Sequence, residues 1–218
     1  MPVAAPPTPS SSSSLAGGRR LLLGILPMST GAALVTLIVA RISMPLAALT
    51  VAGIGITARR FVLRELDPIA RARVMQLTKR AVGAGIAATL AYDATRFGIV
   101  ALADWNIRPF YAIPRFGQQF VGTGGSQAVQ WAVGLTYHVL NGVGFAVAYA
   151  LVVRRPRWGT AVAWALVLEA AMVLMYPQWL GINISKEFTV ISLSGHLAWG
   201  SALYAVLHST EPKVGAPS

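Results

Sequence analysis

The chain has 218 residues, of which 55% are hydrophobic and only 11% are charged, with a mean hydropathy of +0.61. Soluble domains carry roughly 25% charged residues, so this composition excludes a water-soluble globule and predicts an integral membrane protein. The net charge of +11 lies in short clusters between apolar runs and without an aromatic binding platform, so we expect no nucleic-acid partner. Cysteine is absent, which excludes disulfides and thiolate metal sites.

The first part of the chain changes from polar to apolar at residue 21. Residues 1–18 are rich in Pro, Ser and Ala and cannot bury a core, so we expect a disordered tail. A first span is predicted over 21–40, and its length favours an uncleaved membrane helix over a signal peptide. Arg41 and Pro45 predict a tight turn before a second, short span over 46–58, and one long kinked helix over 21–58 is the alternative.

The remaining chain continues the pattern of apolar helices. The segment from Phe61 to Arg80 is basic and amphipathic, which favours a short helix at the membrane surface. Residues 104–127 form a long loop rich in aromatic residues, which favours the membrane interface, and 210–218 form a C-terminal tail. The later spans are predicted over 81–103, 129–153, 159–176 and 189–208. The fold class is therefore an all-α polytopic membrane protein with about six transmembrane helices over residues 19–209.

Lys and Arg are unevenly divided between the two sets of loops. The N-terminal segment, the cluster from Arg59 to Arg80 and the loop with Arg154, Arg155 and Arg157 hold most of them. Basic residues favour the cytoplasmic side, so both termini are predicted to be cytoplasmic.

Five ionisable residues fall inside predicted spans, where a charge costs about 2.5–3.5 kcal/mol. They are Asp93, Arg96, His138, Glu169 and His196. At a rise of about 1.5 Å per residue, all five lie roughly seven to ten residues from the outer end of their spans. Four helices that place ionisable groups at one depth predict a shared polar site in the outer half of the bilayer. The alternatives are an ion pair between Asp93 and Arg96, inter-helix hydrogen bonds from the histidines, and a protonated Glu169.

The two histidine helices share a His-x3-Gly pattern, at His138–Gly142 and at His196–Gly200. Asn141 lies on the same face as His138, and glycine at this step lets another helix pack closely. Each histidine helix follows a helix with a carboxylate, which suggests two related hairpins in a parallel repeat.

Three functions fit this site and stay open at the sequence level. In the first, His138, His196 and Glu169 bind zinc or iron, and the protein is a membrane-embedded enzyme for a lipophilic substrate. In the second, the same groups serve a small proton- or ion-coupled transporter. In the third, the protein is a non-catalytic subunit of a membrane complex, with haem between the two histidines.

Each side chain of the site then has an expected role. Arg96 pairs with Asp93 or binds an anionic group, and Asn141 is a second binding residue. The candidate acid–base groups are Glu169, His138, His196 and Asp93. The expected partners are the lipid bilayer, a lipophilic substrate, and a second copy or another subunit of a membrane complex.

The His-x2-Asn-Gly step at 138–142 and the Gly-His-x3-Gly step at 195–200 resemble those of small bacterial multi-pass proteins of the YagU type. The resemblance covers mainly residues 134–152 and 192–205. The resemblance implies a bacterial inner-membrane protein, and it does not imply any particular reaction.

Overall fold

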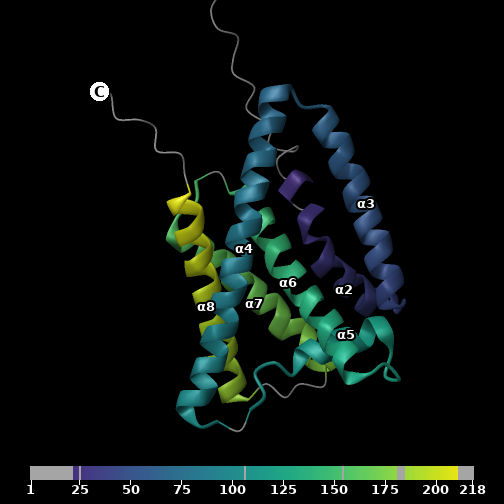
Figure 1. The fold of residues 1–218 in the computed structure, drawn as a ribbon, viewed down its shortest axis with the longest axis vertical. Coiled ribbons are helices and arrows are strands. Elements are labelled where there is room, and N and C mark those ends of the chain that lie inside the picture. Colours follow the sequence, from purple (N-terminus) through teal and green to yellow (C-terminus); the bar gives the residue numbers. More distant parts are fainter. Residues whose placement is uncertain (1–21, 25, 106, 154, 181–184, 211–218) are drawn as a thin grey trace, which may run out of the picture.

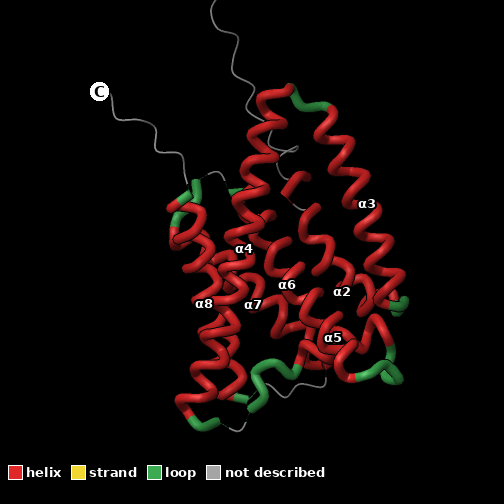
Figure 2. The backbone as a smooth tube through the Cα atoms, in the orientation of Figure 1, coloured by secondary structure: helices red, strands yellow, loops and turns green. Residues whose placement is uncertain are grey.

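The computed structural model describes residues 22–24, 26–105, 107–153, 155–180 and 185–210 (Figure 1). Within these ranges the chain is helical and contains no strand, and its loops gather at the two ends of the bundle (Figure 2). The elements in chain order are η1 (Leu26–Met28), α2 (Ser29–Ala40), α3 (Met44–Arg64), α4 (Pro68–Ala103), α5 (Ala112–Val121), α6 (Gln127–Val152), α7 (Trp158–Leu180) and α8 (Lys186–Ser209). The predicted tail 1–18 and all but the first residue of the predicted tail 210–218 lie outside the described residues.

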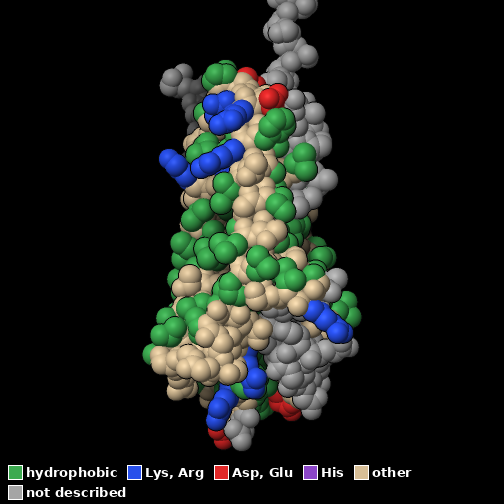
Figure 3. All heavy atoms as spheres, turned by 90° about the vertical axis from the view of Figure 1, so that its right-hand side faces the viewer, with side chains coloured by type: hydrophobic (Ala, Val, Ile, Leu, Met, Phe, Trp, Pro, Cys, Tyr) green, Lys and Arg blue, Asp and Glu red, His purple; other side chains and the backbone are tan. Residues whose placement is uncertain are grey.

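The protein is an all-α polytopic membrane protein. Five of the described helices are long and apolar enough to cross a bilayer: α3, α4, α6, α8 and the Trp158–Met175 part of α7. Figure 3 views the molecule from the α3 side and shows a middle band without Lys, Arg, Asp or Glu, with charged side chains towards both ends. The first predicted span, 21–40, is not one long helix here, because η1 precedes the 12-residue α2.

The turn between α2 and α3 decides between the two interpretations of residues 21–58. Arg41 has a φ of 53°, in the left-handed region that ends a right-handed helix. Pro45 then lies in the first turn of α3, where its missing N–H leaves no bond unmade. The chain therefore forms two helices here, as the tight-turn prediction requires.

The basic segment 61–80 is helical, but it is not a separate surface helix. It is divided between the end of α3 and the start of α4. Asp67 caps α4 by accepting the Ala70 N–H at 2.8 Å, and Pro68 begins the helix. Arg71 donates to the carbonyls of Leu63 at 2.9 Å and Arg64 at 3.3 Å, which closes the turn.

From this turn, α4 runs for 36 residues, or about 54 Å. That exceeds the bilayer's hydrocarbon core of about 30 Å, so one end of α4 extends beyond it. No break follows residue 80 because the sequence there, Arg80-Ala81-Val82, has no helix-ending signal.

The aromatic segment 104–127 is also partly helical. Its helix α5 packs on α6 with Ile113 and Phe116 buried. Gly117 faces the Gln130 carbonyl and Gly134 faces the Ile113 carbonyl so closely that neither position has room for a Cβ atom. Two facing glycines therefore fix α5 against α6.

Two hydrophobic cores hold the bundle. The larger lies among α4, α6, α7 and α8, with Ala88, Tyr149 and Leu203 at its centre, and the smaller joins α2, α3, α5 and α6 around Ala47 and Tyr137. In Figure 1, α2 and α3 lie on one side of α6, and α4 and α8 lie together on the other side. The candidate site lies between these two groups.

Candidate functional site

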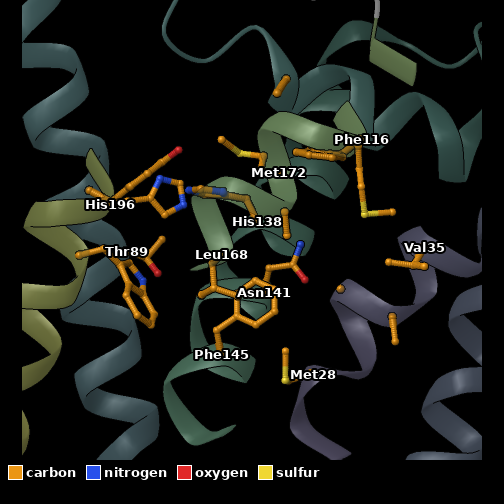
Figure 4. Close-up of a pocket in the computed structure, with 18 of the residues that line it drawn as sticks. Met28, Val35, Thr89, Phe116, His138, Asn141, Phe145, Leu168, Met172 and His196 are labelled. Atoms are coloured by element: carbon orange, nitrogen blue, oxygen red, sulfur yellow. The ribbon is translucent and has the colours of Figure 1, made fainter. Parts of the chain in front are cut away.

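A cavity of about 620 Å³ opens between the helix pair α2–α3 and the larger core. Its volume lies within the usual range of ligand sites, roughly 300–1,000 Å³. The wall is mainly apolar, with residues such as Met28, Val35, Phe145 and Met172 (Figure 4). The polar side chains in the wall are Thr36, Thr89, Tyr92, Arg96, His138, Asn141, Ser192 and His196.

The first polar pair joins α4 to α6. His138 Nε2 lies 3.1 Å from Oδ2 and 3.2 Å from Oδ1 of Asp93. The imidazole lines the cavity, whereas the Asp93 carboxylate is not part of the wall. Among the described residues, Nδ1 of His138 has no hydrogen-bond partner. The carboxylate therefore orients the ring and leaves one nitrogen available.

The second pair joins α7 to α8 and is more enclosed. His196 Nδ1 lies 2.8 Å from Oε2 of Glu169 and 3.0 Å from the Ser192 carbonyl oxygen. The Ser192 hydroxyl donates to the same Oε2 at 2.8 Å. The Glu169 side chain is only 8% exposed, against 21% for Asp93. His196 again lines the cavity, its carboxylate does not, and its Nε2 has no partner in the described chain.

Tyr92 connects the two pairs. Its ring centroid lies 6.0 Å from that of His138 and 5.0 Å from that of His196. The two histidines therefore lie at one level of the bundle, and Figure 4 shows both rings at the same end of the cavity. This confirms that the polar side chains of the four helices come together.

Each carboxylate lies against the histidine of the next spanning helix, Asp93 against His138 and Glu169 against His196. The parallel repeat itself stays a prediction. The glycines four residues after each histidine also have the same packing role. A Cβ at Gly142 would overlap the Thr89 hydroxyl oxygen and lie 3.2 Å from Thr89 Cβ, and one at Gly200 would meet the Ala161 carbonyl oxygen at 2.8 Å. Both glycines thus let the histidine helix approach the carboxylate helix closely.

The predicted ion pair between Asp93 and Arg96 is not formed, because Asp93 binds His138 instead. Arg96 lies over two aromatic rings, with its Cζ 4.9 Å from the Tyr92 centroid and 5.9 Å from that of Phe110. Its Nε is buried without a hydrogen-bond partner, and no carboxylate forms a salt bridge with it in the described ranges. Arg96 therefore presents an unpaired cation to the cavity.

Asn141 lines the cavity one turn from His138 (Figure 4). Its Oδ1 is buried and accepts no hydrogen bond from the described part of the chain. The cavity wall thus holds an unused donor on Arg96 and an unused acceptor on Asn141.

The predicted metal ligands do not form a metal-binding set. His138 is paired with Asp93 and His196 with Glu169, and no group of three His, Asp or Glu side chains with metal-ligand spacing occurs among the described residues. Zinc and iron sites need at least three such ligands. The haem expected between His138 and His196 stays a prediction.

Sequence reasoning missed Tyr92 and Ser192. Ser192 lies four residues before His196, and Tyr92 lies four before Arg96, so both share a helix face with a chosen residue. The four-residue spacing was a signal that could have identified both residues. They were missed because only ionisable side chains are conspicuous in the sequence of a membrane helix.

Comparisons with protein-family models, with curated proteins and with solved structures found no match to this chain. The resemblance to YagU-type proteins therefore stays a prediction.

Proposed function

We propose that the protein is a membrane-embedded enzyme that binds a lipophilic molecule in the cavity and transfers protons to and from it. One observation supports this most strongly. Each histidine lines the cavity, is held through one ring nitrogen by a carboxylate behind it, and has no partner for its other nitrogen among the residues that the structure describes. A carboxylate in this position fixes the imidazole's orientation and stabilises its protonated form, as in acid–base catalysis.

The chemistry needs no metal. One imidazole takes a proton from the bound molecule, and the other returns a proton at a second position, so the net reaction is an isomerisation. The apolar wall excludes water from the reacting molecule, which strengthens electrostatic interactions with the paired groups. Both histidine rings lie beside Tyr92, which supports a proton donor and a proton acceptor at one level of the cavity.

Deuterium exchange tests this without knowledge of the substrate. Membranes that contain the protein are incubated in D₂O with a total bacterial lipid extract, and the lipids are analysed by chromatography and mass spectrometry. We expect at least one lipid to gain carbon-bound deuterium with the wild type and not with the double variant His138→Gln/His196→Gln. His208→Gln is the matched control, because His208 is exposed near the end of α8 and does not line the cavity. Equal labelling by wild type and double variant would refute the proposal.

A second candidate is a proton-coupled carrier of lipophilic molecules. The observation in its favour is that α2 and α3 close one side of the cavity while joining the bundle mainly through the smaller core. A carrier binds the lipophilic molecule and moves protons between oxygen or nitrogen atoms, so it leaves no deuterium on carbon. Binding of the fluorescent apolar probe N-phenyl-1-naphthylamine, together with absence of carbon labelling, favours the carrier.

We also propose the bacterial inner membrane as the location, with both termini in the cytoplasm. The basic residues around the α3–α4 turn and between α6 and α7 support this orientation. Because the chain has no cysteine, single cysteines report accessibility cleanly. An impermeant maleimide should label Thr123→Cys in intact spheroplasts and Arg73→Cys only after permeabilisation. The opposite pattern would reverse the orientation.

A further inference from the structure

We propose that Arg96 binds the anionic headgroup of the ligand, so that the molecule taken into the cavity is a single-headed lipophilic anion, a carboxylate or a phosphate monoester. This rests on the proposed function only in that it concerns the same cavity. It names the substrate class, which the histidine pairs alone do not define.

The charge balance around Arg96 is the first argument. Guanidinium stays protonated in proteins. The two carboxylates of the site are both engaged by histidines, and Arg96 forms no salt bridge within the described chain. An unpaired charge inside a membrane is costly and marks a functional position. An anion that enters the cavity removes this cost, whereas a neutral molecule does not.

The geometry of the side chain is the second argument. The guanidinium lies over the rings of Tyr92 and Phe110, and a Cβ at Gly195 would meet its stem at Cγ, 3.0 Å away. Cation–π contacts use the flat face of the group and leave its N–H groups at the edge unused. The Nε–H is buried and has no partner within the described ranges. Edge N–H groups of a guanidinium bind carboxylate or phosphate oxygens in a forked geometry.

The shape of the cavity is the third argument. Beyond Arg96 the wall becomes apolar, with Phe145 and Leu168 on one side and Met28 and Val35 from η1 and α2 on the other. This suits a hydrocarbon body attached to one charged end. Asn141 Oδ1, buried and without a donor, can accept one hydroxyl or amide hydrogen from that body.

The test compares an acid with its neutral ester on the purified protein in nanodiscs. The fluorescent probe cis-parinaric acid and its methyl ester share one hydrocarbon chain and differ only in charge. We expect wild type to bind the acid at least ~10-fold more tightly than the ester, since hydrogen bonds to charged groups contribute about 1.5–3 kcal/mol. Arg96→Gln should remove this preference while it leaves the ester's affinity unchanged, and Arg96→Lys should keep part of it.

Competition then identifies the source of the anion. Displacement of cis-parinaric acid by oleic acid indicates a carboxylate ligand, displacement by lysophosphatidic acid indicates a lipid phosphate, and inorganic phosphate alone should not compete. Arg115→Gln is the control, because Arg115 stacks on Tyr111 outside the cavity. Equal binding of acid and ester by wild type, or an unchanged preference in Arg96→Gln, would overturn the inference and leave the proposed proton transfer standing. Failure of both probes to bind would overturn both.

Discussion

At the scale of single residues, the partner of each ionisable group decides its chemistry. Asp93 and Arg96 are one turn apart on α4, so local spacing favours a pair between them. Tertiary packing instead places His138 Nε2 3.1 Å from Asp93 Oδ2, and the Arg96 guanidinium lies over the Tyr92 ring. The identity of the ionisable residues could be predicted from sequence, whereas their pairing depended on which helices become neighbours.

Ser192 donates a hydrogen bond to the same Glu169 oxygen that lies beside His196. We expect Ser192→Ala to lower the free energy of unfolding by about 1 kcal/mol, since a buried hydrogen bond between helices is lost. Thermal unfolding in detergent measures the effect. Ser209→Ala is the control, because Ser209 donates only to Val206 O at the exposed end of α8. Equal stability of both variants would show that the Ser192 hydroxyl does not support Glu169.

The absence of a three-ligand group among the described residues gives a prediction about metal content. Zinc and iron in the purified protein should be the same for the wild type and for His138→Ala/His196→Ala, and neither should show a haem band. Elemental analysis and a visible spectrum measure this. Stoichiometric metal that is lost in the double variant would instead restore the metalloenzyme hypothesis.

At the scale of helices, glycine positions set how closely elements approach. The sequence predicted close packing at Gly142 and Gly200 from the His-x3-Gly steps, and the structure confirms it. The contact of Gly117 and Gly134 between α5 and α6 was not predicted, because the aromatic segment 104–127 was interpreted as a loop, although residues 112–121 separate apolar and polar side chains at a helical period. The boundary between α3 and α4 also differs from the predicted surface helix over 61–80. Asp67 and Pro68 start α4 inside that segment, and hydropathy alone does not mark this start.

Gly200 offers a direct test of this packing. An added Cβ would meet the Ala161 carbonyl oxygen at 2.8 Å and Val162 Cα at 2.9 Å, which are backbone atoms that cannot move aside. We expect Gly200→Ala to destabilise the protein by about 1–3 kcal/mol. Gly98→Ala is the matched control in a spanning helix, because nothing lies within 4 Å of its Cβ position. The thermal midpoint should fall only for Gly200→Ala, and a fall of equal size in both would contradict close packing of α7 and α8.

At the scale of the whole molecule, the helix pair α2–α3 forms one wall of the cavity. The N-terminal residues before α2 contact α6 and so connect this helix pair to the rest of the bundle. A Cβ at Gly24 would lie 3.4 Å from the Cβ of Val152. That separation lies at the short edge of the range of about 3.5–4.5 Å between the Cβ atoms of a disulfide.

We therefore expect Gly24→Cys/Val152→Cys to form a disulfide on mild oxidation, detected as a gel shift reversed by reductant. If α2–α3 moves to admit ligand, N-phenyl-1-naphthylamine should bind more slowly to the oxidised than to the reduced protein. The wild type, which has no cysteine, should bind the probe equally under both conditions. Equal rates in both forms of the variant would show that the cavity fills without movement of this segment.

The sequence by itself determined that the chain is an all-α membrane protein and which helices carry ionisable groups, and it predicted that these groups lie at one depth. It could do so because lipid requires long apolar helices and because a fixed rise per residue converts position into depth. Only the tertiary structure decided that the histidines form two separate carboxylate pairs, that Arg96 is left unpaired, and that a cavity lies beside them. Those features depend on the rotation and neighbours of each helix, which small residues such as Gly142, Gly195 and Gly200 set through contacts distant in sequence.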